Sequence, residues 1–386
     1  MARQDFFETS NRHNFIGLNP AEVLSKMPTP RKAVQELTPD QHGGLDYARL
    51  RAEGIAPDEM MDFSVNSNPF GPPPAVWEAL ARVDIPRYPD PEAGLLRERL
   101  AALGGLLPAQ VLVTNGTAQA IWLVALAYLD PGDVVLIVGP TFGEYRVACQ
   151  LMAATVHTLF AHEERGFCPD VAEMTNWISD HRPRLVWLCN PNNPTGVYLD
   201  REAVESILAA CQAVGSLLVV DEAYVNFTDM PWDSVPLLES GHLLLLRSMT
   251  KDFALAGLRL GYVLGPEESI RALRRAQPPW SVNAAAQAAG LAALDHLEEY
   301  RETWRVLRGM TEDLRTAIGK LGYPVLPTSV NFFLVRTGDG DRTRTALARR
   351  RILVRSCRSF GLPAHIRIGT RLPEENRHLL EALADE

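Results

Sequence analysis

The sequence has no long apolar run: no stretch approaches the roughly 18 residues that a membrane-spanning helix requires. Its first residues include Asp5 and Glu8, where a secretory signal peptide would have an apolar segment. Cysteine is scarce, and the five cysteines are scattered without the spacing of metal ligands. Few, scattered cysteines are typical of a protein whose thiols stay reduced. We therefore expect a cytoplasmic protein with no membrane partner and no metal site.

Basic residues are also fewer than acidic ones: the sequence has 38 lysines and arginines and 47 aspartates and glutamates, which gives a net charge of −9. This balance argues against nucleic acid as a partner, although it permits a local basic pocket for an anionic substrate. A Gly-x-Gly-x-x-Gly motif after an early strand is missing, which argues against a dinucleotide-binding dehydrogenase. Residues 1–41 contain no basic helical pair, which argues against a DNA-binding regulator.

The chain has 386 residues, and 46% of them are apolar, which is ordinary for a globular protein but long for a single core. We expect an N-terminal extension at 1–41, either a disordered arm or a strap over another surface. Asn19 and Pro20 are suited to start a short helix there. Residues 42–75 are expected to contribute to a small domain and the active site, 76–290 to form a large domain, and 291–386 to form a smaller α+β domain.

Short apolar segments alternate with helical patterns through the large domain. This alternation predicts an α/β fold with a mostly parallel sheet that is covered on both faces. Residues 287–318 are charged and largely helical, which indicates a long exposed connecting helix. The expected strands of the sheet are residues 110–114, 133–138, 155–160, 184–189, 217–220, 243–246 and 260–264.

Unusual loops follow these strands, and ligands of open α/β sheets bind at the carboxyl ends of strands. The sequence 116–118, Gly-Thr-Ala, opens a helix whose free N–H groups suit a phosphate. Lys251 lies just past an apolar strand, where a lowered pKa supplies a nucleophilic amine. Taken singly, Lys251 and Arg259 also fit surface residues, Asp221 fits a helix cap, and Phe142 fits the core.

Taken together, these residues meet the needs of one phosphorylated aromatic aldehyde: a phosphate cradle, a carboxylate for the ring nitrogen, donors to the phenolate, an aromatic lid and a lysine. The set resembles the class I/II aminotransferase superfamily, which comprises fold-type I pyridoxal-phosphate enzymes. The motifs that carry the resemblance are Gly-Thr-Ala (116–118), Asn-Pro-Asn-Asn-Pro-Thr-Gly (190–196), Asp-Glu-Ala-Tyr (221–224), Ser-Met-Thr-Lys (248–251) and Gly-Leu-Arg-Leu-Gly-Tyr (257–262).

The resemblance implies an aspartate-aminotransferase-like fold with a seven-stranded sheet, pyridoxal 5′-phosphate as cofactor, and a homodimer with shared active sites. It makes Lys251 the Schiff-base lysine and the proton carrier at Cα. It places Asp221 on the pyridinium nitrogen and Asn193 and Tyr224 on O3′, with Tyr224 also in a catalytic role. Phe142 would stack on the cofactor ring.

The same resemblance assigns the cofactor phosphate to the loops around it. The residues concerned are Gly116, Thr117, Ala118, Ser248 and Arg259, and Tyr88 would reach the phosphate of the neighbouring subunit's cofactor.

Two families within the superfamily compete: threonine-phosphate decarboxylases and histidinol-phosphate aminotransferases. Three features resemble the decarboxylases more closely. They are His-Gly-Gly at 42–44 followed by Asp-Phe-Ser-Val-Asn-Ser-Asn-Pro at 62–69, Arg-Tyr-Pro-Asp-Pro at 87–91, and the stretch 354–362 followed by Arg367. Asp252 and the long N-terminal extension depart from both families, so another aminotransferase stays open. The substrate-binding residues implied are His42, Gly43, Asn68, Asn193, Arg355 and Arg367. Where the two arginines hold the substrate decides which Cα bond breaks.

Overall fold

The computed structural model describes residues 28–386, so the helix expected at Asn19 and Pro20 lies outside the described residues. Residues 38–386 form one compact unit. A separate unit ends at Leu37, and its described part holds the short helix α2, Lys32–Gln35. No helix within residues 28–386 has the length and apolarity to cross a membrane. The expected boundaries at 41, 75 and 290 stay predictions.

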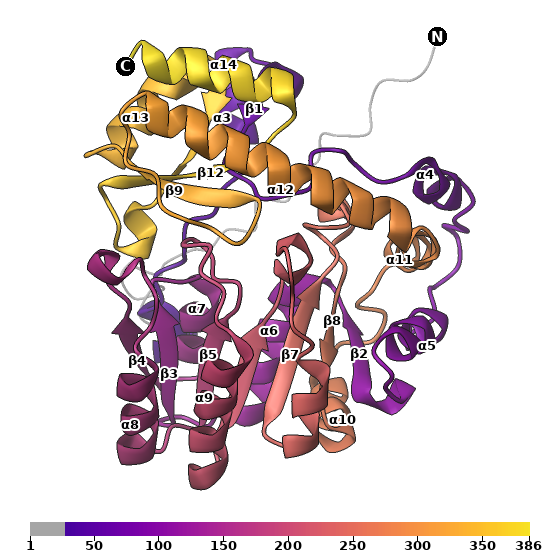
Figure 1. Ribbon diagram of the computed structural model, residues 1–386. Coiled ribbons are helices and arrows are strands. Elements are labelled where there is room, and N and C mark those ends of the chain that lie inside the picture. The colour runs from indigo at the N-terminus through magenta and orange to yellow at the C-terminus, as the bar shows by residue number, and fades with distance from the viewer. Residues whose placement is uncertain (1–27) are drawn as a thin grey trace, which may run out of the picture. The chain divides into compact units, whose positions relative to one another are not determined.

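A seven-stranded sheet forms the centre of the larger lobe, with strand order β2-β8-β7-β6-β5-β3-β4 (Figure 1). β8 is antiparallel to both of its neighbours and the other pairs are parallel, which confirms the predicted mostly parallel sheet. Strands β5 and β6 are buried along their whole length because helices cover both faces. The strands are β2 Val111–Thr114, β3 Val134–Gly139, β4 Thr155–Phe160, β5 Leu185–Cys189, β6 Leu217–Asp221, β7 Leu243–Ser248 and β8 Gly261–Leu264.

Two apolar layers hold the helices on this sheet. On one face pack α6 (Gly116–Tyr128), α7 (Glu144–Leu151) and α10 (Glu267–Ala276). On the other pack α8 (Val171–His181) and α9 (Arg201–Val214), together with more N-terminal helices. Those helices are α4 Pro74–Ala81 and α5 Gly94–Leu103, and α3 Tyr47–Glu53 precedes them. Helices α8 and α10 were not among the predicted elements, although each buries apolar residues at helical spacing.

The smaller lobe contains an antiparallel sheet with the order β11-β12-β9. Near it, β1 (Met61–Asp62) pairs in parallel with β10 (Ile352–Leu353), so an early segment joins the C-terminal part of the chain. The remaining elements are β9 Phe332–Arg336, α13 Gly340–Arg349, β11 Arg355–Ser356, β12 His365–Gly369 and α14 Pro373–Ala384. Phe63, Phe333 and Ile366 lie in the core beneath these elements.

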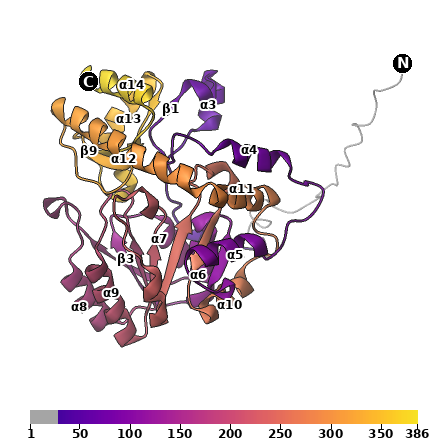
Figure 2. The ribbon, with the colours of Figure 1, turned by 45° about the vertical axis from the view of Figure 1, so that its right-hand side comes forward.

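Two helices link the lobes where one exposed helix was expected. The chain breaks at His296 between α11 (Ala284–Asp295) and α12 (Leu297–Lys320). The charged side chains of α12 are largely exposed, as expected, but the helix is not exposed on all sides, because it buries a stripe of side chains three to four residues apart. The stripe comprises Tyr300, Trp304, Leu307, Thr311, Leu314 and Ile318. Figure 2 shows α12 running from α11 to the C-terminal elements.

Candidate active site

A cavity of about 400 Å³ opens at the carboxyl ends of the parallel strands and is closed from the opposite side by the smaller lobe. It brings together most of the residues predicted from the sequence. The predicted residues that line it are His42, Gly43, Thr117, Ala118, Phe142, Asn193, Asp221, Tyr224, Ser248, Lys251, Arg259, Arg355 and Arg367.

Three predicted residues lie outside the lining. Gly116 has a φ of +71°, and a Cβ there would come within 3.0 Å of the Arg259 guanidinium, so glycine lets that arginine approach. Asn68 points elsewhere, because its side chain donates to the carbonyl of Asp252 at 3.1 Å and to Thr303 Oγ1 at 2.9 Å. Tyr88 is 80% exposed and its ring lies 4.8 Å from that of Trp280.

Lys251 follows the buried strand β7 and lines the cavity. Desolvation of the amine, followed by repulsion from Arg367 and Arg259, lowers the pKa of Lys251 to about 8. A substantial fraction is therefore the neutral amine at mildly alkaline pH. This is the protonation state that attacks a carbonyl carbon.

Asp221 ends β6 at the floor of the cavity and is 3% exposed. Its carboxylate accepts hydrogen bonds from Tyr145 Oη at 2.7 Å and from the Ala223 N–H at 3.0 Å. Burial raises the pKa of Asp221 to about 6. Such a carboxylate is stabilised in its charged form by a protonated ring nitrogen brought close to it. Tyr145, which also stacks on Trp187, was missed by sequence reasoning although it lies three residues after Phe142.

An anion site lies at the start of α6. The first-turn N–H groups of a helix have no acceptor within the helix, and Thr117 and Ala118 line the cavity there. Ser248 Oγ and Thr250 Oγ1 lie 2.6 Å apart at the end of β7, and Arg259 adds a positive charge. Backbone donors, hydroxyls and a guanidinium together suit a phosphate.

Two buried guanidiniums form the opposite end of the cavity. Arg367, on β12, donates to Asn193 Oδ1 and to the carbonyl of Ser64. Arg355, on β11, donates to the carbonyl of Gln41 at 2.5 Å, to that of Ser356 at 2.8 Å and to Ser359 Oγ. Every one of these acceptors is uncharged. Burial lowers the pKa of each arginine below its ordinary value, yet both remain cations at neutral pH.

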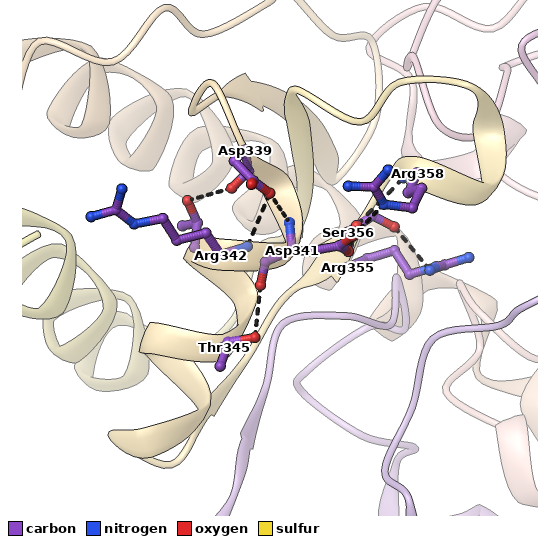
Figure 3. Close-up of polar contacts among 8 residues, drawn as sticks. Asp339, Asp341, Arg342, Thr345, Arg355, Ser356 and Arg358 are labelled. Carbon is purple, nitrogen blue, oxygen red and sulfur yellow. Dashed lines mark hydrogen bonds and ion pairs between the residues drawn. The ribbon is translucent and has the colours of Figure 1, made fainter.

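The first turn of α13 anchors the segment that carries Arg355. Asp341 accepts a hydrogen bond from Ser356 Oγ at 2.5 Å and pairs with the Arg358 guanidinium (Figure 3). Asp339 caps the same helix through the N–H groups of Asp341 and Arg342. The chain that follows Arg355 is thus fixed to α13 through two of its side chains.

His42 and Glu144 meet at the edge of the cavity, with His42 Nε2 3.1 Å from Glu144 Oε1. The hydrogen bond to Glu144 raises the pKa of His42, and the same bond lowers the pKa of Glu144, so the proton favours the imidazole. Trp122 Nε1 donates to the other carboxylate oxygen at 3.2 Å. Sequence reasoning missed Glu144, which only the fold brings to His42.

Ser64 and Asn66 also line the cavity without having been predicted. Asn66 Nδ2 donates to Tyr224 Oη at 3.3 Å, and Ser64 Oγ accepts from the Gly44 N–H at 2.7 Å. Both residues belong to the Asp-Phe-Ser-Val-Asn-Ser-Asn-Pro stretch at 62–69, whose resemblance to decarboxylases was the available signal.

Comparisons with known proteins agree with this geometry. The family model described as aminotransferase class I and II matches residues 58–383. A histidinol-phosphate aminotransferase from Symbiobacterium thermophilum is 36% identical over 363 residues, covering 92% of this chain and 98% of that protein. A threonine-phosphate decarboxylase from Salmonella typhimurium is 35% identical over 354 residues, covering 89% and 95%. The crystal structure of histidinol-phosphate aminotransferase from Sinorhizobium meliloti in complex with pyridoxal-5′-phosphate shares the fold, with a TM-score of 0.82 at 23% identity over 94% of this chain and 98% of that one.

Proposed function

The chain belongs to the class I and II aminotransferase family and is a pyridoxal-phosphate-dependent enzyme, and we propose that it decarboxylates a phosphorylated amino acid of the threonine-phosphate type. One observation carries this proposal: Arg355 and Arg367 are both buried and both have only uncharged hydrogen-bond acceptors. Asp40 and Asp62 attract these arginines, but within residues 28–386 neither carboxylate forms an ion pair with them. Buried cations without a paired anion are costly, and a substrate with a carboxylate and a phosphate would supply one anion to each.

The residues present fit the cofactor. Gly116 lacks the Cβ that would press against Arg259, and the first-turn residues Thr117 and Ala118 of α6 line the cavity, which supports a phosphate there. We propose that Lys251 binds the cofactor aldehyde, that Asp221 holds its ring nitrogen, and that Asn193 and Tyr224 contact O3′. When bound, the cofactor supplies an electron sink for negative charge that develops at Cα.

The protein's own residues then select the reaction. Arg355, Arg367 and His42 hold the substrate anions and so fix the remaining substituents of Cα. If the arginine that binds the carboxylate orients the bond between this carboxylate and Cα for cleavage, CO₂ would be lost. If these groups orient the Cα–H bond toward Lys251, its amine takes that proton and transamination follows. A displacement of about 1 Å at this end of the cavity is enough to change the rates by orders of magnitude.

A second candidate is an aminotransferase that acts on histidinol phosphate, with 2-oxoglutarate as amino acceptor. The name of the relative from Symbiobacterium thermophilum, at 36% identity, favours it. Histidinol phosphate has one anionic group, so in this case Arg355 or Arg367 would act on the dicarboxylate acceptor.

A substrate comparison separates the two candidates. The purified protein is incubated with phosphothreonine, and in parallel with histidinol phosphate plus 2-oxoglutarate, while CO₂ and glutamate are measured. Release of CO₂ from phosphothreonine without 2-oxoglutarate supports the decarboxylase. Formation of glutamate alone rejects it in favour of the aminotransferase.

We also propose a cytoplasmic homodimer with shared active sites. Tyr88 and Ile85 are 80% and 85% exposed, and Trp77 and Leu95 are exposed on the adjacent helices α4 and α5, which supports a partner subunit covering this face. Sedimentation of the holoenzyme tests the dimer, and Ile85→Glu should convert it to monomers with little activity. A monomeric wild-type protein with full activity would contradict the shared site.

A further inference from the structure

The loop after Lys251 is held through its backbone carbonyls. The carbonyl of Lys251 accepts the Asn68 N–H at 2.8 Å. The carbonyl of Asp252 accepts Asn68 Nδ2 at 3.1 Å and Trp304 Nε1 at 2.8 Å. The carbonyl of Phe253 accepts Tyr300 Oη at 3.0 Å. Three successive carbonyls are thus bound by side chains and backbone from distant parts of the chain.

The donors are buried and lie outside the cavity lining. Asn68, Tyr300 and Trp304 are 3%, 1% and 5% exposed. Tyr300 and Trp304 stand one turn apart on the buried stripe of α12, and the ring of Phe253 lies 4.8 and 5.4 Å from theirs. Asn68 is tied to the same helix through Thr303 Oγ1 at 2.9 Å. These residues contact the lysine's own loop and not the space where ligands bind.

The side chain of Asp252 completes the restraint. One carboxylate oxygen accepts the Phe253 N–H at 3.0 Å, and the other accepts Asn226 Nδ2 at 2.6 Å. Asp252 is 2% exposed, which gives this departure from the family pattern a structural role. The loop is therefore fixed on its carbonyl side by α12 and the loop after β1, and on its side-chain side by Asn226.

We propose that Asn68, Tyr300 and Trp304 are positioning residues that hold the backbone of Lys251 so that its amine stays directed at the reacting atoms. Strand β7 ends at Ser248, and the Met249 N–H still donates to the carbonyl of Leu260 at 3.0 Å. The buried carbonyls of residues 251–253 lie beyond this pairing and require other donors. This role rests on the proposed function of Lys251 as the cofactor lysine.

A consequence is that one helix serves both ends of the cavity. The first half of α12 holds the Lys251 loop, whereas Leu314 and Ile318 in its second half pack in the core of the smaller lobe, beneath the sheet that carries Arg355 and Arg367. Helix α12 therefore helps to fix the distance between Lys251 and the two arginines, because it contacts the elements that carry each of them.

Matched variants test the proposal. Trp304→Phe and Tyr300→Phe each remove one donor and keep the ring. The controls remove the same kind of bond elsewhere: Trp232 Nε1 donates to the carbonyl of Leu199 at 3.1 Å, and Tyr323 Oη donates to that of Leu383 at 3.2 Å. Trp232→Phe and Tyr323→Phe are therefore compared with them in kcat, KM, Tm and the pH dependence of Lys251 acetylation in the cofactor-free protein.

We expect Trp304→Phe and Tyr300→Phe to lower kcat about three- to tenfold each, with KM changed less than about twofold, because each loses one hydrogen bond that positions the lysine and none that binds substrate. A loosened loop admits water, so the midpoint for acetylation of Lys251 should move upward from about 8. The control variants should lose similar Tm without either change.

The outcomes distinguish this inference from the proposed function. Borohydride reduction of the wild-type holoenzyme should attach the cofactor to the peptide that contains Lys251. If no cofactor is attached to that peptide, the proposed function itself is rejected. If the cofactor is attached there but Trp304→Phe and Tyr300→Phe match their controls in kcat and acetylation midpoint, the positioning role is overturned. Tyr300→Phe decides the matter alone if Trp304→Phe fails to fold.

Discussion

The two ends of the cavity are built in different ways. The lysine end is formed at the carboxyl ends of neighbouring strands of one sheet, with Asp221 as the last residue of β6 and Lys251 just after β7. The arginine end combines Gln41 and Ser64 from the early part of the chain with Arg355 and Arg367 near its C-terminus. One end is thus fixed by a rigid sheet, and the other by contacts between segments distant in sequence. The first suits an invariant cofactor and the second suits a variable substrate.

The largest effect should come from the lysine end. Lys251→Ala removes the nucleophilic amine and should lower kcat by about a thousandfold or more, because covalent catalysis loses its reacting group. The visible absorbance of the holoenzyme should disappear as well. Lys320→Ala, at the exposed end of α12, is the control and should change neither. Near-normal turnover in Lys251→Ala would remove the distinction between the two ends.

The arginine end should respond in substrate binding alone. Arg367→Lys keeps a charge but loses the planar fork that binds an anion with two hydrogen bonds, so kcat/KM should fall by about ten- to a hundredfold. The cofactor absorbance should be retained. Arg336→Lys, on the neighbouring strand β9 and exposed, controls for the loss of an arginine. Loss of the cofactor in Arg367→Lys would show that the ends are not separable.

The buried carboxylate of Asp221 should favour cofactor binding and, at the same time, lower the stability of the cofactor-free protein. Because burial raises its pKa from 3.8 to about 6, the folded cofactor-free protein is destabilised above pH 6, by up to about 3 kcal/mol, and is not destabilised below about pH 4, where the group is protonated in both states. Cofactor-free Asp221→Asn should therefore be about 1–3 kcal/mol more stable than wild type at pH 8, and the gain should vanish toward pH 4.

Urea unfolding at both pH values measures the free energy of unfolding, with exposed Asp180→Asn as the control. The same Asp221→Asn variant should bind the cofactor more weakly than wild type. Equal stability of wild type and Asp221→Asn at pH 8 would contradict a destabilising buried charge on Asp221.

The smallest effect should come from the edge of the cavity. Glu144→Gln removes the carboxylate that raises the pKa of His42, so the imidazole loses its proton at lower pH. Because a charged His42 attracts the substrate anion, KM at neutral pH should rise about two- to threefold, as expected for a partly exposed pair. The rise should fade at acidic pH, where His42 is protonated in both proteins. If the ratio of the KM of Glu144→Gln to that of wild type did not change with pH, His42 would be excluded from anion binding.

The same contrast explains what the sequence could predict. The sheet was predicted strand by strand, and Asp221, Ser248 and Lys251 lie in the cavity because each stands at or just after the carboxyl end of an apolar strand. No local pattern shows that Glu144 meets His42, since about a hundred residues separate them. Asn68 was assigned to the substrate from its motif, but its side chain turns toward Asp252, and only three-dimensional packing decides between such neighbours.

The pairing of β1 with β10 has a consequence for the order in which the protein matures on the ribosome. The strands of the large sheet lie between Val111 and Leu264, so they are available to associate while the rest of the chain is still being synthesised. Met61 and Asp62 must wait for Ile352 and Leu353, which emerge near the end of translation. A truncated chain that ends before β10 therefore keeps Lys251 but lacks the strand with which β1 pairs. Such a fragment should fold its large sheet without gaining the ability to recognise a substrate.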